Sequence, residues 1–254
     1  MVAYWRGGGQ DVGVGEDVVL LHGFGQTHRA FDGVVAGLPA GRYRPLVPDL
    51  PGHGSAGGRR PISFASCIAE LAAAAPPSFV LCGYSQGGRI ALHLALAHPD
   101  RVTRLVLVST TAGIEDPAAR AARRAADEAL AGRIEREPLG DFVAAWNDQT
   151  LFAGETEGVR RAAVVDQLRN TPTGLAAALR GLGTGAMQPV WGRLGELSVP
   201  VSVLAGERDH KFVGLGRRLA DGIPDASFDI VGGAGHRLLA EAPGAVAAAL
   251  APRT

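Results

Sequence analysis

Six short apolar segments recur along the chain, and each ends at a glycine or a polar turn. They are VVLL (18–21), RPLVPDL (44–50), FVLCGY (79–84), RLVLVS (104–109), PVSVLAG (200–206) and SFDIVG (227–232). None alternates strictly between polar and apolar residues, which is typical of strands buried on both faces of a parallel sheet. Stretches with helical spacing lie between them, for example 64–75, 87–98 and 241–251. This alternation predicts an α/β fold with a mostly parallel, doubly wound sheet.

One long region interrupts the alternation of strands and helices. Between residues 113 and 192 the patterns are helical and no strand-like run occurs. Open α/β sheets bind ligands at the carboxyl ends of their strands, so an insertion here is expected to cover that edge. We therefore predict a core formed by residues 1–112 and 193–254 and a helical cap formed by residues 113–192. The cap carries nine arginines and eleven acidic residues, a net charge of −2, and is not a basic patch.

The charge balance of the whole chain limits its partners. Lys and Arg together number 25, Asp and Glu also number 25, and the formal net charge is zero. This balance argues against nucleic acid or an anionic membrane surface as the main partner. An anionic small molecule would have to be held by individually aimed cations. The oligomeric state is left open by the sequence.

The sequence also indicates the cellular compartment of the protein. The segment MVAYWRGGGQ lacks the apolar core of a signal peptide, and no apolar run approaches the roughly 18 residues of a membrane span. Cys67 and Cys82 both lie in apolar surroundings. Two buried free thiols in a reducing compartment are the simplest interpretation, so we expect a cytoplasmic protein.

The segment Gly83-Tyr84-Ser85-Gln86-Gly87 follows one predicted strand and opens a predicted helix. A sharp strand-to-helix turn can expose a serine hydroxyl above a sheet, and it needs glycines because side chains would clash there. The five-residue pattern alone is weak, but its position between a strand and a helix is the one the motif requires. We therefore expect Ser85 to be a reactive residue.

A serine hydroxyl needs a base, and the chain offers seven histidines. His93 and His98 lie in or near the helix after Ser85, which suits core or capping roles, and His53 suits a turn. His236 follows the last apolar segment on a glycine-rich loop that can reach over the sheet. His236 is therefore the predicted base.

The imidazole of such a base needs a carboxylate that fixes its tautomer. Asp209 stands just past the segment PVSVLAG, at the same predicted edge of the sheet, and Glu207 is the alternative. The chain order Ser85, Asp209, His236 is the order used by one sheet architecture. An oxyanion would be stabilised by the N–H of Gln86 and by the N–H of Phe24, which lies in the turn HGFG after the first apolar segment.

These motifs resemble those of the α/β-hydrolase superfamily, and the resemblance covers essentially the whole chain. Five segments carry a more particular resemblance: HGFGQTHRAF, PDLPGHG, GYSQGGRIAL, LRNTPTGLAAALRGLGTGAMQPVW and AGERDHKF. The first three are shared with many esterases. The GTG-A-x-x-P-x-W pattern and the loop Gly-Glu-Arg-Asp-x-Lys-Phe are similar to those of the 2-succinyl-6-hydroxy-2,4-cyclohexadiene-1-carboxylate synthases of the menaquinone pathway.

The resemblance implies a lyase that eliminates pyruvate from 2-succinyl-5-enolpyruvyl-6-hydroxy-3-cyclohexene-1-carboxylate. Ser85 would then act as a base through His236 and Asp209, with no acyl-enzyme. The residues that match substrate-binding positions of the family are Tyr84, Arg89, Arg123, Trp146, Arg169 and Lys211. Arg124 is the alternative to Arg123. Lys211 is the only lysine of the chain.

The main alternative is a serine hydrolase of a small ester, thioester, lactone or carbon–carbon bond, in which Ser85 is a nucleophile. A non-catalytic binding protein on the same fold would not need all three triad groups. One departure concerns the exact substrate: the family often has a second histidine three residues after the first, where this chain has Leu239. No metal or organic cofactor is expected, because no histidine–carboxylate cluster has ligand spacing and GGGQDVGVGED lacks a preceding strand.

Overall fold

The protein is described here by a computed structural model that covers residues 4–6 and 15–252. Within these residues the chain forms a seven-stranded sheet in the order β1-β3-β2-β4-β5-β6-β7. The strands are β1 Tyr4–Arg6, β2 Glu16–Leu21, β3 Tyr43–Pro48, β4 Phe79–Tyr84, β5 Val102–Val108, β6 Val201–Gly206 and β7 Ala226–Val231.

Strands β2 to β7 pair in parallel, and β1 runs antiparallel to β3 at one edge. The predicted mostly parallel sheet is therefore confirmed, and β1 is an addition that the apolar pattern did not indicate. The glycine-rich segment 7–14 lies outside the described residues, as does most of the N-terminal segment MVAYWRGGGQ, for which the sequence predicts no signal peptide.

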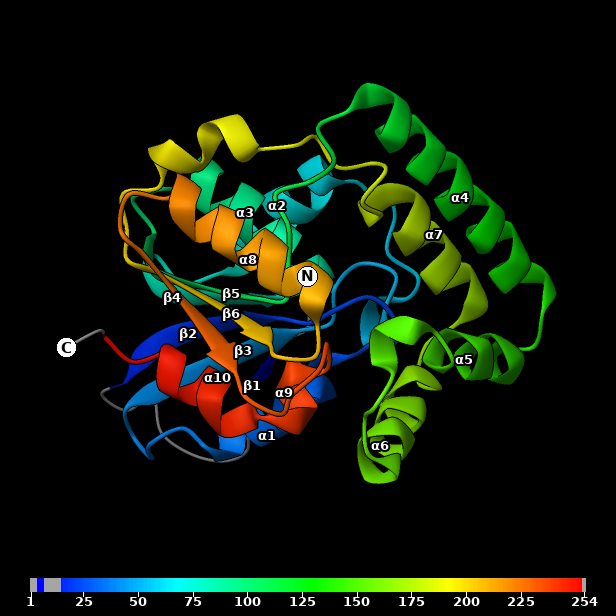
Figure 1. Ribbon diagram of the computed structural model, residues 1–254, viewed down its shortest axis with the longest axis horizontal. Helices are drawn as coiled ribbons and strands as arrows, with labels where there is room; N and C mark the ends of the chain where they lie inside the picture. The colour runs from blue at the N-terminus through cyan, green and yellow to red at the C-terminus, as the bar shows by residue number, and fades with distance from the viewer. Residues whose placement is uncertain (1–3, 7–14, 253–254) are drawn as a thin grey trace.

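Helices cover both faces of the sheet (Figure 1). The helices α2 Phe64–Ala74, α3 Gln86–Ala97 and α8 His210–Gly222 lie on one face, and α1 Asp32–Ala36, α9 Leu238–Glu241 and α10 Pro243–Ala249 lie on the other. Alternate residues of β2 show why helices can pack on both faces of the sheet. Val19 and Leu21 pack into the first core layer, whereas Val18 and Leu20 pack into the second, and all four are fully buried. The sheet is doubly wound because its central strands are apolar on both sides.

Two local differences from the predicted elements have simple causes. The segment expected as one C-terminal helix is divided at Pro243, which opens α10 because proline has no N–H to continue a preceding helix. Strand β7 is not buried on both faces, and Ile230 in it is 46% exposed. It pairs with β6 on one side and lies at the end of the strand order.

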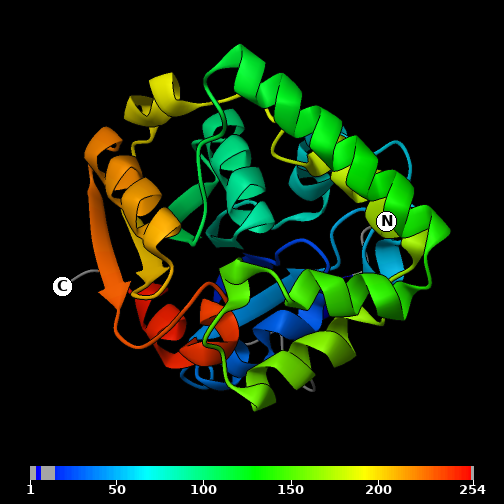
Figure 2. The same ribbon diagram turned by 45° about the vertical axis from the view of Figure 1, so that its right-hand side comes forward.

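Four helices and a 3-10 turn, all between β5 and β6, form the inserted region within the part of the chain that the structure describes. They are α4 Pro117–Arg136, α5 Leu139–Asn147, η3 Thr150–Phe152, α6 Glu157–Gln167 and α7 Pro172–Leu182. Figure 2 shows them wrapped around one side of the sheet. These elements lie inside the predicted cap, residues 113–192. Three further 3-10 turns are η1 His28–Phe31, η2 Gly54–Ala56 and η4 Trp191–Glu196.

The sequence specifies where the cap helices begin. Asp116 caps α4 by accepting the Ala119 N–H at 2.6 Å, and Thr171 caps α7 by accepting the Gly174 N–H at 3.1 Å. In both helices a proline follows the N-capping residue at the first helical position, where its missing N–H costs nothing. A small apolar cluster of its own joins α4, α5 and α7, so the cap is a packed layer.

Both cysteines are buried free thiols, as the sequence predicts. Burial raises the pKa of Cys67 to about 12 and raises that of Cys82 as well, so neither is a thiolate at neutral pH. Among the described residues, no helix combines the length and the apolar character that crossing a bilayer requires.

Candidate active site

Ser85 stands at the turn between β4 and α3 with a backbone φ of 50° and ψ of −107°. Such a conformation costs about 1–3 kcal/mol for a residue with a side chain and persists only where its surroundings hold it. The Ser85 N–H donates to the Val108 carbonyl at 2.9 Å, and the Thr110 hydroxyl donates to the Ser85 carbonyl at 2.7 Å. Strand β5 therefore fixes the strained turn from one side.

The two glycines of the turn are required by close packing. A Cβ atom on Gly83 would lie 2.4 Å from the Gly87 carbonyl oxygen, and one on Gly87 would lie 2.0 Å from the Leu21 carbonyl oxygen. Both distances are far below contact distance. The pattern Gly-x-Ser-x-Gly therefore lets the helix start directly against β2 and leaves the serine side chain at the carboxyl edge of the sheet.

The side chains of Ser85, His236 and Asp209 form one hydrogen-bonded chain. The distance from His236 Nε2 to Ser85 Oγ is 3.3 Å, and the distance from His236 Nδ1 to Asp209 Oδ2 is 2.6 Å. His236 and Asp209 are 4% and 5% exposed. A carboxylate at Nδ1 favours the tautomer that leaves the Nε2 lone pair directed at the serine hydroxyl. The arrangement can accept a proton from Ser85.

Glu207, the alternative carboxylate, points elsewhere. It accepts the Gly233 N–H at 2.8 Å and thereby fixes the loop that leads to His236. Asp209 reaches the imidazole because the Gly206–Asp209 turn, closed by a 3.0 Å backbone hydrogen bond, carries it to the start of α8.

The predicted oxyanion donors both face the cavity. Phe24 and Gln86 are among its lining residues. Within the described part of the chain, neither backbone N–H donates a hydrogen bond to another residue. Gln86 is also the first residue of α3, where the helix dipole adds positive potential. The two N–H groups are therefore available to an oxyanion.

Residues of the cap hold the loop that carries Phe24. Asp166 accepts the backbone N–H of Thr27 at 2.9 Å and its hydroxyl at 2.5 Å. Asn170 donates to the Gly25 carbonyl at 2.7 Å. On the core side the Gly25 N–H donates to His53 Nε2 at 3.1 Å, and burial lowers the pKa of His53 to about 3. His53 therefore remains a neutral acceptor at physiological pH.

Other histidines also have structural partners. His22 accepts the Leu50 N–H at 3.0 Å, and burial lowers its pKa, so it too is neutral. His93 packs its ring 4.9 Å from that of Phe64, which agrees with the predicted core role. His236 is thus the histidine that contacts Ser85.

A cavity of about 640 Å³ opens above Ser85, between the sheet edge and the cap. Of the predicted site residues, those that line it are Phe24, Tyr84, Ser85, Gln86, Arg89, Arg123, Trp146, Asp209, Lys211 and His236. The described residues contain no group of three or more His, Cys, Asp or Glu side chains placed to hold a metal ion. The cavity is instead lined by arginine, lysine, aromatic and hydroxyl side chains.

Arg89 is a buried cation of this cavity. It is one turn after Ser85 on α3, is 7% exposed, and donates from Nη1 to the Leu182 carbonyl at 2.9 Å. Among the described residues, no carboxylate oxygen lies within 4.0 Å of its guanidinium nitrogens. Burial, together with the neighbouring Arg123, lowers the pKa of Arg89 to about 9, so the side chain stays charged at neutral pH. The charge of Asp127, beyond ion-pair distance, raises the pKa and offsets only part of the cost of burial, so the guanidinium can still bind an anion.

Another cation of the cavity is Arg123, on helix α4 of the cap. Its Nε donates to Asp127 at 2.7 Å, four residues along α4, and its side chain is 42% exposed. Asp127 also accepts the Gly185 N–H at 3.2 Å. Arg124, the alternative, faces a separate surface hollow between α4 and α7 and does not line the cavity. The helix register therefore directs Arg123 to the site.

Aromatic rings enclose the imidazole. The ring centroids of Phe212, Tyr84 and Phe152 lie 4.7, 5.5 and 6.0 Å from that of His236. Burial raises the pKa of Tyr84 above its ordinary value, so its phenol is neutral. Lys211 lies beside this group with its Nζ 5.5 Å from the Phe212 ring centroid.

Trp146 combines two roles. It packs against the apolar cluster of the cap, and its ring lies 5.1 Å from that of Phe24. It also lines the cavity. The ring contact joins the cap to the loop that carries one oxyanion donor.

Arg169 lies outside the site, contrary to the prediction. Its side chain is exposed, and it is absent from the cavity lining. The turn that ends α6 directs the next residue inward instead, since Asn170 is buried and contacts Gly25 and Gly54. A change of one position at a helix end rotates a side chain by about 100°.

Three residues near His236 were not predicted. Phe212 ends the AGERDHKF motif, so that motif contained a signal for it. Phe152 and Arg237 line the cavity as well. Arg237 follows His236 directly, but nothing in the sequence distinguishes it from a surface arginine.

A parallel sheet with an inserted helical layer and a serine, histidine and aspartate hydrogen-bonded at its carboxyl edge defines an α/β-hydrolase-fold enzyme. The model of the alpha/beta hydrolase family matches residues 18–249. The chain belongs to this family.

Individual relatives are similar over nearly the whole chain. The sequence is 35% identical over 239 residues to a candidate 2-succinyl-6-hydroxy-2,4-cyclohexadiene-1-carboxylate synthase of Bacillus subtilis (strain 168), covering 90% of this chain and 86% of the other. It is 34% identical to the synthase of that name from Enterobacter sp. (strain 638), covering 92% and 90%. The structure of MenH from S. aureus superposes with a TM-score of 0.87 at 28% identity, covering 97% and 96%.

Proposed function

We propose that this protein eliminates pyruvate from 2-succinyl-5-enolpyruvyl-6-hydroxy-3-cyclohexene-1-carboxylate and so forms the cyclohexadiene product named for its relatives. The observation that carries the proposal is Arg89: a buried guanidinium, charged at neutral pH, in the same cavity as Ser85. A substrate with several carboxylates provides the counter-ion that this site lacks. A neutral ester does not.

The proton path follows the hydrogen-bonded chain. His236 Nε2 accepts the Ser85 proton, and Ser85 Oγ removes the acidic proton next to the substrate carbonyl. The electron pair of that C–H bond forms a new ring C=C bond, and the existing ring C=C bond shifts by one position. The C–O bond to the enolpyruvyl group breaks, and its electron pair leaves as the enolate of pyruvate, which takes up one proton to become pyruvate. The N–H groups of Phe24 and Gln86 stabilise the enolate oxygen. Asp209 stabilises the imidazolium while it holds the proton.

The cations of the cavity divide the substrate carboxylates among them. Arg89 binds one carboxylate at the wall next to Ser85. Arg123, from the cap, and Lys211, from the start of α8, bind the others nearer the opening, where both side chains are more exposed. Charge-assisted hydrogen bonds of this kind are worth about 1.5–3 kcal/mol each.

The strained turn at Ser85 also favours a second candidate, a serine hydrolase of a small ester, thioester, lactone or carbon–carbon bond. In that reaction Ser85 forms a covalent intermediate, and the same N–H groups stabilise a tetrahedral oxyanion. The two reactions differ in what they demand of Arg89, which elimination from a multi-carboxylate substrate needs and hydrolysis of a neutral ester does not.

The test supplies the enolpyruvyl cyclohexene substrate and follows free pyruvate with a coupled reductase. We expect enzyme-dependent release for the wild type and release at the spontaneous rate for Ser85→Ala. The matched control is Arg180→Met, an arginine of α7 that pairs with Glu128 and Glu135 on the cap surface. It should release pyruvate at the wild-type rate. A wild-type rate equal to the spontaneous rate would eliminate the proposal, and near-normal release by Ser85→Ala would refute the role of Ser85.

A further inference from the structure

Arg237, the residue after the predicted base His236, is buried against the cap. Its side chain is 4% exposed. Its Nε donates to Glu155 Oε2 at 2.5 Å, and its Nη2 donates to Asn147 Oδ1. Its guanidinium carbon lies 3.9 Å from the centre of the Phe152 ring. All three partners belong to the cap, so the arginine connects the loop of His236 to that layer.

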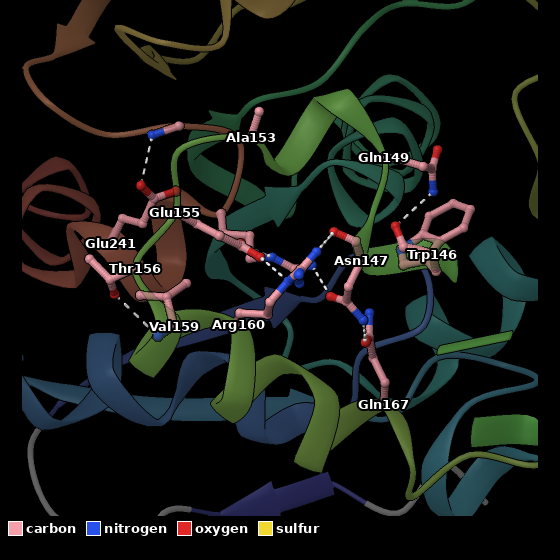
Figure 3. Close-up of polar contacts among 12 residues, drawn as sticks. Trp146, Asn147, Gln149, Ala153, Glu155, Thr156, Val159, Arg160, Gln167 and Glu241 are labelled. Carbon is pink, nitrogen blue, oxygen red and sulfur yellow. Dashed lines mark hydrogen bonds and ion pairs between the residues drawn. The ribbon is translucent and has the colours of Figure 1, made fainter. Parts of the chain in front are cut away.

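The partners of Arg237 are themselves fixed inside the cap. The Asn147 side chain donates from Nδ2 to Gln167 at 2.7 Å and to the Val143 carbonyl at 2.6 Å. The backbone carbonyl of Asn147 accepts a hydrogen bond from Arg160 at 2.6 Å. Arg160 Nε also lies 3.6 Å from Glu155. Figure 3 shows these side chains of α5, α6 and the connecting segment converging at Asn147. Arg237 therefore binds a framework that is already held together.

The same segment of the cap forms a wall of the cavity. Trp146, Gln149, Thr150, Leu151 and Phe152 all line it. Phe152 contacts two successive residues: its ring centre is 3.9 Å from the Arg237 guanidinium carbon and 6.0 Å from the centre of the His236 ring. The position of the imidazole and the position of this wall are thus set by one group of contacts.

A buried ion pair of this kind is weak evidence for stability, since removing two charges from water offsets most of their attraction. The geometry of the pair, which fixes the orientation of the Arg237 guanidinium, tells more about its role than its small contribution to the free energy of folding. A planar guanidinium that bonds Glu155 and Asn147 at once has one orientation, and a lysine ammonium cannot reproduce it. An apolar pair of similar size would fill the space without defining that orientation.

We propose that Arg237 is a positioning residue that couples the cap wall 146–155 to His236 and keeps the imidazole within reach of Ser85. The inference rests on the Ser85–His236–Asp209 part of the proposed function and holds whether Ser85 acts as a base or as a nucleophile. It assigns to the cap a role in aligning the base, in addition to binding the substrate.

The experiment replaces Arg237 alone and then together with Glu155. Two rates report how well His236 and Ser85 are aligned. The variants are Arg237→Met, Arg237→Lys and the double variant Arg237→Met with Glu155→Met. The matched control is Arg180→Met, which removes an arginine from the cap without touching Arg237, its partners or the His236 loop. The readouts are kcat and KM for pyruvate release, the rate at which a small neutral fluorophosphonate labels Ser85, and the melting temperature.

In the double variant we expect a melting temperature close to that of the wild type, because the uncompensated charge is gone. We expect kcat and the labelling rate to fall about ten- to a hundredfold, the effect of misplacing a reacting group by about 1 Å, while KM changes little. Arg237→Lys should recover only part of either rate. Arg180→Met should keep both rates within about twofold of the wild type.

A double variant with wild-type kcat and labelling rate would overturn the inference, because stability would then be the only role of the pair. An equal loss in Arg180→Met would also overturn it, since the integrity of the cap and not the link to His236 would be responsible. If the wild type releases no pyruvate, the proposed elimination fails, but the labelling rates still decide the role of Arg237.

Discussion

A methionine in place of Arg89 should change two measurable quantities in opposite directions. The free energy of unfolding should rise, and the turnover of the carboxylate substrate should fall. The reason is the same in both cases: Arg89 is 7% exposed, and among the described residues no carboxylate lies within ion-pair distance of it. Without a bound anion, this buried charge lowers the free energy of unfolding.

The size of the cost follows from the pKa. Burial lowers the pKa of Arg89 to about 9. Relative to an ordinary arginine pKa of about 12.5, at about 1.4 kcal/mol per pKa unit, this is about 5 kcal/mol at most. Methionine leaves the Leu182 carbonyl without its donor, which costs about 1–3 kcal/mol. The net gain is therefore about 2–4 kcal/mol, or about 5–10 °C in melting temperature for a chain of this size.

The pH dependence has a definite sign. Because the folded-state pKa lies below the unfolded one, the unfolded state holds the proton more tightly, and the cost of the charge is complete at every pH below about 9. It fades only as the pH rises above that value. The advantage of Arg89→Met over the wild type should therefore be the same at pH 6 and pH 8.

The assay compares Arg89→Met with the wild type in two measurements. The first is urea unfolding at pH 6 and pH 8, and the second is the kinetics of pyruvate release and of hydrolysis of a neutral test ester. The value of kcat/KM for pyruvate release should fall by at least about tenfold, the scale of one lost charge-assisted contact. Hydrolysis of the ester, where detectable, should change little. A less stable Arg89→Met variant, or an equal loss on both substrates, would show that Arg89 is structural and would refute the reasoning.

Three further outcomes are expected. Asp209→Asn should lower kcat for pyruvate release by about 10⁴, as expected for loss of the orienting carboxylate in a triad. Glu207→Gln, at the alternative carboxylate, should keep kcat within about tenfold of the wild-type value. Equal losses of kcat in the two variants, measured in stopped assays, would contradict the assignment of Asp209. His53 has its pKa lowered to about 3 by burial, so stability should fall as the pH drops from about 6.5 toward 3, and His53→Gln should lose about 2 kcal/mol less between pH 7 and pH 5 in urea unfolding. Gly87→Ala should unfold the protein or lower its melting temperature sharply, because its Cβ would lie 2.0 Å from the Leu21 carbonyl oxygen; calorimetry checks this.

The parts of the site that were predictable are those encoded by short-range patterns on parallel strands. Ser85, Asp209 and His236 each follow a strand, and parallel strands bring their carboxyl ends to one edge, so three distant residues meet there. The strain at Ser85 is likewise local, because it depends on glycines two residues away. Helix spacing placed Arg89 one turn after Ser85, on the cavity side.

The parts that were not predictable depend on how the ends of cap elements pack. Arg169 and Asn170 are neighbours in sequence, and only the turn that closes α6 determines which of them faces inward. The partners of Arg237 lie more than 80 residues away in the chain and share no spacing or motif with it. Long-range side-chain pairs of this kind have no signature in a single sequence.

The cap is attached at two separate points to the loops that carry the predicted catalytic groups. Asp166 and Asn170, at the end of α6, hold the loop of the oxyanion donor Phe24. Glu155 and Asn147, at the other end of the same stretch, hold Arg237 and through it the loop of His236. Helix α6 lies between the two attachments. A displacement of this helix would therefore shift the predicted oxyanion donor and the predicted base together, whichever of the two reactions they serve.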